Sequence, residues 1–292
     1  MDTSAAREVV LQHIAERRQR LIESRALGPV AAVARRFKEI DGATQGVLIS
    51  VQIFTVVIPL MVLGFSYFTG FAEHVSPGTV WIRELDLDGA TSETVRGAFG
   101  DSAGLRSTWT VVGLTVFLAW GIPMSITVAG MFAKAWQREQ FSAGQRLLRG
   151  AVWFVLYLLM LVLRERLAFG PEYGGGTQWV MIVVSLIPVW VFWSLTPVIL
   201  VRDGGYGLRY LALAGLAGVV IDGVIVPIIG RLIFPKVIDG WTEFGPIGVA
   251  MALITWCGVL GTAWVVTACV GAVLWERTAP TDTVIEAQTA GE

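Results

Sequence analysis

Charged residues are scarce in this chain of 292 residues, where Lys, Arg, Asp and Glu together make up 15%, against about 25% in ordinary soluble domains. Histidine is rarer still, since His13 and His74 are the only two and neither lies in an apolar segment. The sequence contains no HExxH, GxSxG, P-loop or CxxC motif. These absences exclude a soluble enzyme and a zinc site within a membrane, so we expect no enzymatic activity and no cofactor or metal.

Basic clusters and paired cysteines are also lacking. The formal net charge is -1, whereas a nucleic-acid surface requires clustered Lys and Arg. The two cysteines, Cys257 and Cys269, lie about 18 Å apart if their segment is helical, which is too far for a disulfide bond. We therefore expect no nucleic-acid partner and two buried thiols.

Apolar residues dominate what is present, with 54% hydrophobic residues, 33 Gly and 12 Trp. Gly is common in membrane helices and Trp at membrane interfaces, so this composition predicts a polytopic membrane protein. Six segments have the roughly 20 apolar residues that a spanning helix needs: 43–68, 108–133, 150–163 with a possible extension to 169, 179–201, 210–234 and 246–275. The third is short because Arg164, Glu165 and Arg166 interrupt it, unless it starts nearer Leu147.

The distribution of Lys and Arg predicts the orientation of these segments. If all six cross the membrane, 15 of the 22 Lys and Arg residues fall on one side and seven on the other. The richer side faces the cytoplasm, so both termini should be cytoplasmic. The predicted domains are a cytoplasmic arm over 1–42, a transmembrane domain over 43–275 with an external loop at about 69–107, and a polar cytoplasmic tail over 276–292.

The arm carries apolar residues at helical spacing beside its basic residues, which predicts two amphipathic helices separated by Gly28 and Pro29. Such helices can lie on the anionic inner leaflet of the membrane. They can equally pack on the cytoplasmic face of the protein itself. The predicted fold is thus an all-α membrane protein, a bundle of six transmembrane helices with kinked segments and a cytoplasmic amphipathic N-terminal arm.

Asp222 is the most informative residue, because it falls at the middle of the fifth segment, where an Asp costs about 2.5 to 3.5 kcal/mol to insert. Ala214, Gly215 and Gly218 share its helical face and permit another helix to approach closely, so Asp222 should point inward. No Lys or Arg lies at comparable depth in another segment. Two hypotheses remain: a proton or cation relay or substrate contact, or a neutral carboxyl that stabilises the helix packing.

Prolines interrupt four of the predicted spans: Pro59, Pro123, Pro188, Pro197 and Pro227. Each removes a backbone donor and is expected to kink its helix. Transporters use broken helices near the middle of the membrane for substrate and ion sites, whereas in other proteins such kinks only serve packing. Pro227 follows Asp222 by five residues, so Gly218, Asp222 and Pro227 are predicted to shape one site.

From Arg36 to Trp275 the chain resembles the YihY/BrkB family of bacterial inner-membrane proteins. The similar segments are Phe-Thr-Val-Val-Ile-Pro-Leu at 54–60, Phe-Leu-Ala-Trp at 117–120 followed by Phe-Ala-Lys-Ala-Trp at 132–136, Gly-Leu-Ala-Gly at 215–218 with Asp222, and Phe-Gly-Pro-Ile-Gly at 244–248 with Trp256. Asp222 stands where many members have Glu, and Gly-Thr-Ala at 261–263 departs from the acid-containing Gly-Ala-Glu common in the last helix. The resemblance implies an all-α protein of the bacterial cytoplasmic membrane, of unsettled activity, with suggestions of envelope lipid handling.

These observations predict a transporter-like or lipid-translocating protein with its polar site around Asp222 and membrane lipids as its partners. The alternative is a scaffold subunit of a cell-envelope assembly, which binds envelope proteins or a second copy of itself. An intramembrane enzyme ranks third, because it requires Asp222 to meet a second acid or one of four hydroxyl side chains: Ser50, Thr55, Ser125 or Thr127. A ribonuclease activity has no support in the sequence, because its two histidines are far apart and the chain has no basic groove.

Overall fold

The structure is a computed structural model that describes residues 27–68, 89, 92–93, 109–168, 176–205, 207–241, 244 and 246–279. Every regular element within these residues is helical. The first half of the predicted arm, most of the predicted external loop and nearly all of the polar tail lie outside the described residues. The all-α class is therefore confirmed for the part of the chain that is described.

The helices are α2 (Leu27–Glu39), α3 (Gly42–Phe68), α6 (Trp109–Ala135), α7 (Ala143–Ala168), α8 (Gly176–Val184), α9 (Leu186–Leu200), α10 (Leu208–Gly218), the π-helix η2 (Val219–Ile225), α11 (Val226–Trp241) and α12 (Pro246–Thr278). α3 and α6 begin and end within two residues of the predicted spans. The possible extension of the third span is confirmed, because α7 continues through the charged residues at 164–166 to Ala168, and the helix begins earlier than predicted, at Ala143. The fourth span is divided into α8 and α9, and the fifth runs on to Trp241.

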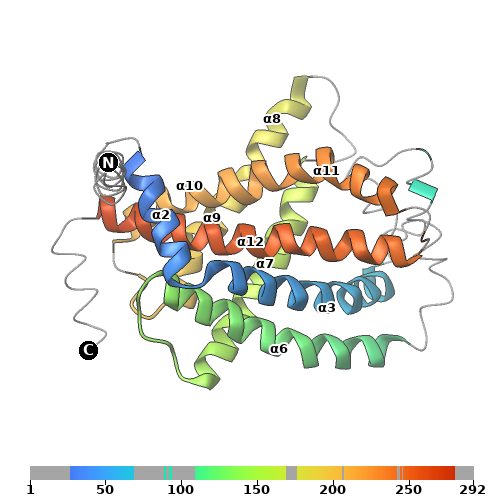
Figure 1. Ribbon diagram of the computed structural model, residues 1–292, viewed down its shortest axis with the longest axis horizontal. Coiled ribbons are helices and arrows are strands. Elements are labelled where there is room, and N and C mark those ends of the chain that lie inside the picture. The colour runs from blue at the N-terminus through green and yellow to red at the C-terminus, as the bar shows by residue number, and fades with distance from the viewer. Residues whose placement is uncertain are drawn as a thin grey trace, which may run out of the picture.

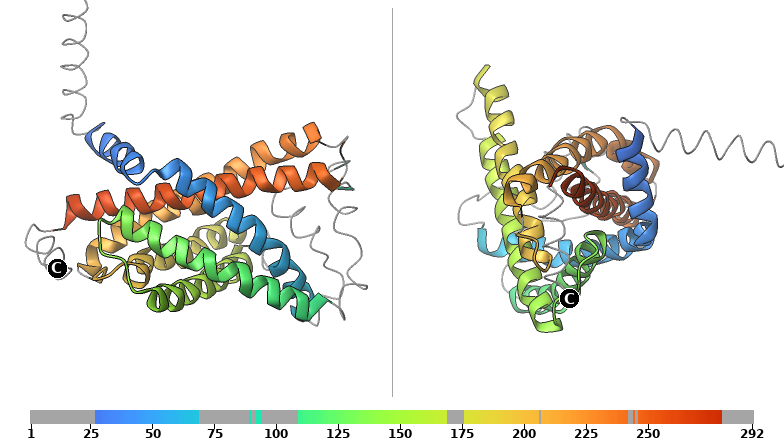
Figure 2. Two further views of the ribbon diagram at one scale, coloured as in Figure 1. Left: turned by 60° about the horizontal axis from the view of Figure 1, so that its bottom comes forward. Right: turned by 90° about the vertical axis from the view of Figure 1, so that its left-hand side faces the viewer.

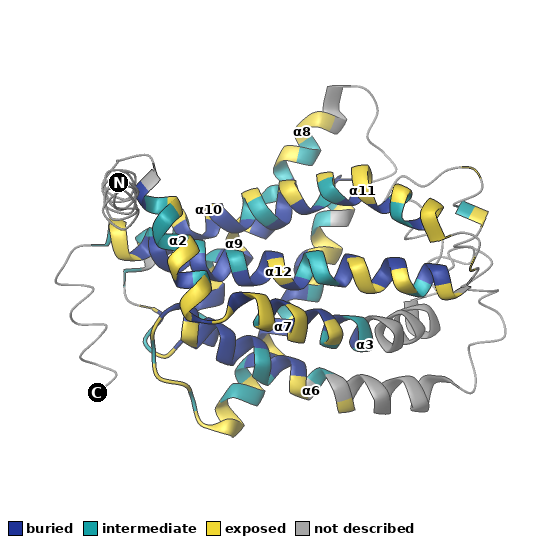
Figure 3. Cartoon of the chain, viewed as in Figure 1, coloured by how far each residue is buried: buried dark blue, intermediate teal, exposed yellow. Residues whose placement is uncertain are grey.

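Four stretches in the described part of the chain are long and apolar enough to cross a membrane: Ala143–Ala168, Trp179–Leu200, Arg209–Trp241 and Ile247–Thr278. α3 adds the shorter apolar stretch Gly42–Val56. Many large apolar side chains on the outside of the bundle are exposed, as Figure 3 shows along α8 and α11. Lipid would cover such side chains in a membrane.

The long helices pack side by side into a closed ring. α3 lies between α12 and α6 (Figure 1); α6 also packs against α7, α7 against α9, α9 against α10, and α10 and α11 against α12. Glycines permit the close approaches, since an added Cβ would meet the partner helix at Gly150 of α7, Gly215 of α10 and Gly261 of α12. This small-residue packing is typical of membrane helices.

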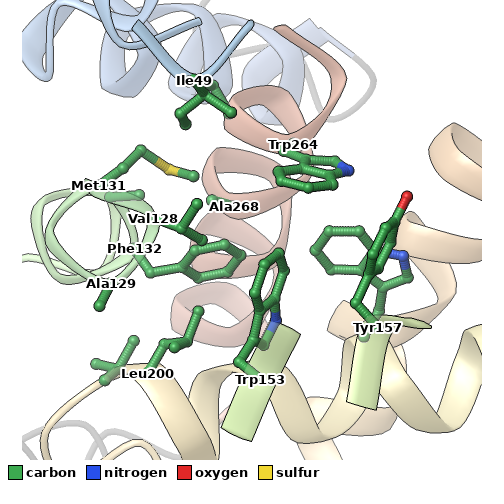
Figure 4. Close-up of a cluster of buried hydrophobic side chains, with 14 of the residues drawn as sticks. Ile49, Val128, Ala129, Met131, Phe132, Trp153, Tyr157, Leu200, Trp264 and Ala268 are labelled. Carbon is green, nitrogen blue, oxygen red and sulfur yellow. The ribbon is translucent and has the colours of Figure 1, made fainter. Parts of the chain in front are cut away.

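The interior of the ring is rich in aromatic side chains. Figure 4 shows Trp153 and Tyr157 of α7 beside Trp264 of α12 and Phe132 of α6. The ring of Trp153 meets that of Trp264 edge-on at a centroid distance of 5.2 Å, and Tyr157 meets Trp264 at 5.0 Å. Edge-to-face contacts of this kind stabilise a packed core beyond the area that they bury.

Helix α2 packs on the protein, across the end of α12 (Figure 2). Its Arg36 is 8% exposed and donates to the carbonyl of Ala135 at 2.6 Å and to both carboxylate oxygens of Glu276 at 2.9 and 3.0 Å. Arg36 thereby ties together α2, the end of α6 and the end of α12. Of the two alternatives for the arm, this half follows the second, because its buried face contacts protein.

Replacing Arg36 by Ala should lower the free energy of unfolding by about 2 kcal/mol, because the buried carbonyl of Ala135 loses its donor. The matched control is Arg35→Ala, since Arg35 is exposed and only pairs with Glu39 at 3.6 Å on the same helix; such a pair contributes about 0.3 to 0.5 kcal/mol. Thermal unfolding of both variants in detergent measures the difference. Equal losses in the two variants would contradict the anchoring role of Arg36.

Candidate functional site

Asp222 lies within the π-helical turn η2, near the middle of the apolar stretch Arg209–Trp241, and is 4% exposed. Pro227 accounts for this turn, because it has no N–H to donate and its ring crowds the carbonyl of Gly223, four residues earlier. The helix widens, and the N–H of Val226 donates to the carbonyl of Ile221, five residues back. The site therefore begins with a local departure from the α-helix, a feature that is frequent at functional sites.

Arg164 of α7 supplies a donor to this irregular turn. Its Nη2 donates to the carbonyl of Gly223 at 3.1 Å, which is the carbonyl that loses its α-helical donor because of Pro227. The prediction that no cation reaches the depth of Asp222 is thus wrong: α7 continues past Arg164, and this long side chain extends to η2.

Trp193 of α9 provides the direct partner of the carboxyl group. Its indole Nε1 donates to Oδ2 of Asp222 at 3.2 Å. Gly218 makes this contact possible, because a Cβ at that position would overlap the side chain of Trp193. The predicted inward direction of Asp222 is confirmed by its burial. The missing side chain at Gly218 leaves the space that the indole of Trp193 occupies.

An aromatic wall surrounds this pair. Trp193 meets Phe192 edge-on at 5.2 Å and stacks on Phe132 at 6.4 Å, while Tyr157 contacts Phe192 at 5.5 Å. The indole nitrogen of Trp264 is buried and lies on the same side of the cluster as the Tyr157 hydroxyl (Figure 4). The neighbourhood of Asp222 therefore combines apolar walls with a few polar atoms.

The other predicted kinks differ in their outcome. Pro188 lacks the N–H that would reach the carbonyl of Val184, and the fourth span is interrupted at the intervening Ser185, between α8 and α9. α6 continues through Pro123 and α9 through Pro197 without interruption. Pro59 falls within α3, but its side chain lies outside the described residues. Of the five prolines, Pro227 is the one that adjoins Asp222 along its own helix.

The hydroxyl groups proposed for an intramembrane enzyme bond to their own helices. Ser50 donates to the carbonyl of Val47 at 2.7 Å, and Ser125 donates to that of Gly121 at 2.9 Å. The hydroxyls of Thr55 and Thr127 do the same within α3 and α6. Among the described residues, no three His, Cys, Asp or Glu side chains form a group that could hold a metal ion.

Sequence inspection missed Arg164 and Trp193 as members of the site. In the sequence, Arg164 is one of the charges that interrupt the third span, and Trp193 is not singled out. The available signal was the extent of α7, since a helix that continues to Ala168 places Arg164 within reach of its neighbours. No family model, curated protein or solved structure matches this chain. Its function must therefore be inferred from Asp222 and the residues around it.

Proposed function

We propose that this chain is a transporter-like or lipid-translocating protein of the bacterial cytoplasmic membrane, with its polar site at Asp222. The observation that carries the proposal is the buried carboxyl group of Asp222 in a π-helical turn. Trp193 donates a hydrogen bond to one of its oxygens, and Arg164 donates to the backbone carbonyl of the next residue, Gly223. An ionisable residue inside the membrane is costly and generally serves a substrate or ion path. Transporters build such paths at interrupted helices.

The proposal includes six spans and membership of the YihY/BrkB family. α3 and α6 have 27 residues each, and a helix of this length is about 40 Å long, which exceeds the roughly 30 Å hydrocarbon core. Added to the four apolar stretches already described, they make six. The excess of Lys and Arg at the end that carries α2 and the end of α12 supports a cytoplasmic location for that end.

Single cysteines at two exposed positions test this orientation: Ser142, in the connection before α7, and Gly240, near the end of α11. Both would be introduced after replacing the buried Cys257 and Cys269 by Ala. In intact spheroplasts, an impermeant maleimide should label the cysteine at 240 and should label that at 142 only after the membrane is opened. The reverse pattern would place the termini outside, and equal labelling of both in intact cells would contradict a spanning bundle.

A scaffold subunit is the second candidate. The close packing favours it, because Asp222 is 4% exposed and Trp193 directly covers one of its oxygens. In that case the carboxyl group only stabilises the contact between α9 and η2.

Flux measured in proteoliposomes, for a panel of lipids, cations and small solutes and with or without a proton gradient, tests the transport proposal. A substrate whose movement requires the purified protein and is lost in Asp222→Asn supports it. Absence of any protein-dependent flux across the panel, with the protein correctly inserted, would favour the scaffold.

A further inference from the structure

A second polar site lies at one end of the bundle and shares no lining residue with the site at Asp222. A pocket of about 590 Å³ opens between the connection that leads into α7 and the turn that follows α9. Six polar residues contribute to its lining: Gln140, Ser142, Gln145, Arg149, Arg202 and Asp203. Clefts that bind small ligands have volumes in this range.

Arg149 is held in a fixed orientation in this pocket. Its guanidinium carbon lies 4.2 Å from the centre of the Phe141 ring, and its Nη1 donates to the carbonyl of Ile199 at 3.1 Å. An arginine has five N–H donors, so the bonds from Nη1 leave the other guanidinium nitrogens to serve a ligand. A planar guanidinium stacked on an aromatic ring is suited to binding phosphate.

Arg202 provides the second positive charge and is more easily released. It pairs with Glu139 at 2.7 Å, and both side chains are largely exposed, at 45% and 61%. An exposed pair is weak and screened by salt, so an anion entering the pocket can replace Glu139 on Arg202. Asp203 also lines the pocket, and its Oδ2 lies 3.8 Å from Nε of Arg202. Once Glu139 is displaced, the two arginines face this single carboxylate.

We propose that this pocket binds a phosphate group between Arg149 and Arg202. The start of α7 adds to the attraction, because Ser142 and Gln145 line the pocket and the first turn of α7 contains no acidic residue, so its positive dipole end is not neutralised. The phosphate can belong to an anionic phospholipid headgroup or to a soluble phosphate compound. Basic pockets between spanning helices at the cytoplasmic side are suited to the first source.

Two substitutions with opposite expected effects test this binding. In the purified full-length protein, Arg202→Gln should weaken binding of the phosphate probe about tenfold, because one charge-assisted hydrogen bond is lost. Glu139→Gln removes the competing carboxylate and should strengthen binding about threefold. The control is Arg209→Gln, since Arg209 is exposed beside Tyr210 and does not line the pocket.

Two probes distinguish the sources: phosphatidylglycerol, followed by native mass spectrometry of the protein in neutral detergent, and inorganic phosphate, followed by calorimetry. Binding of phosphatidylglycerol alone, with the expected order of variants, supports a lipid headgroup, and binding of inorganic phosphate with that order supports a soluble compound. Binding of neither probe, or equal binding by Arg202→Gln and Arg209→Gln, would overturn the proposal. Because no flux is measured, the result is independent of Asp222.

Discussion

Gly218→Ala should destabilise the protein even though Ala is the better helix former. In an exposed helix this change gains about 1 kcal/mol. At Gly218, however, the new Cβ would overlap the side chain of Trp193, which is itself fixed between Phe132 and Phe192. Overpacking costs about 1 to 3 kcal/mol or more, and separating α10 from α9 also stretches the Trp193–Asp222 hydrogen bond. We expect a net loss of about 2 kcal/mol in the free energy of unfolding, and a larger loss for Gly218→Val.

Gly258→Ala is the matched control, because Gly258 lies within α12 and a Cβ there meets no atom within 4 Å. It should be neutral or stabilising by up to about 1 kcal/mol. Thermal unfolding in one detergent compares the two variants. A double-mutant cycle with Trp193→Ala identifies the cause, since removing the indole ring should abolish most of the penalty at Gly218. Equal effects at positions 218 and 258, or no coupling to Trp193, would show that the close approach is not what makes Gly218 necessary.

The direction of Asp222 could be predicted from the sequence because it depends on one helix alone. Ala214, Gly215 and Gly218 recur at helical spacing before it, and small residues mark the face on which another helix packs. The structure places all three, and Asp222 with them, on the buried side of the fifth span. The stripe of small residues could not identify the hydrogen-bond partner of Asp222. Trp193 belongs to another helix, α9, which precedes the turn that leads into α10.

The π-helical turn could be predicted only in part. Pro227 indicates that the backbone donor is missing, but a kink, a break or a wider turn can each follow. The preceding span illustrates the difference, since Pro188 coincides with an interruption at Ser185 between α8 and α9. Around Pro227 the chain stays helical, and Arg164 from α7 bonds the carbonyl of Gly223. Such a donor, 59 residues away along the chain, leaves no periodic signal.

The positions of charged residues did not predict where α7 ends, and they did not decide whether α2 lies on a membrane or on the protein. The apolar window ends at Arg164, which leaves a short span and an extension to residue 169 both open. A long charged side chain can remain on a helix and bring its charge to a polar atom nearby. At α2 the basic residues are compatible both with a membrane surface and with packing on the protein, and the structure shows Arg36 buried against Ala135 and Glu276 while Arg35 is exposed. Which arginine serves which role depends on neighbours that are distant in the sequence.

Asp222→Asn should leave the protein folded and abolish transport. The amide oxygen of Asn can still accept the indole N–H of Trp193, at nearly the same volume, so the free energy of unfolding should change by less than about 1 kcal/mol. An amide does not release a proton or carry a charge, so a relay or cation contact is lost. Flux in proteoliposomes and thermal unfolding, measured on the same preparation, give the two results.

Trp193→Phe is the complementary variant, because it keeps an aromatic ring but removes the N–H that Asp222 accepts. It leaves a buried carboxyl oxygen unpaired, so it should cost about 1 to 3 kcal/mol of stability, yet the ionisable group remains and flux per folded molecule should persist. A transport site therefore predicts a crossed pattern, in which Asn impairs flux and Phe impairs stability. If Asp222 serves only the packing of α9 on η2, function follows stability in both variants, and Asp222→Asn is fully active. Full activity of Asp222→Asn at matched expression would end the transport proposal at this site and favour the scaffold.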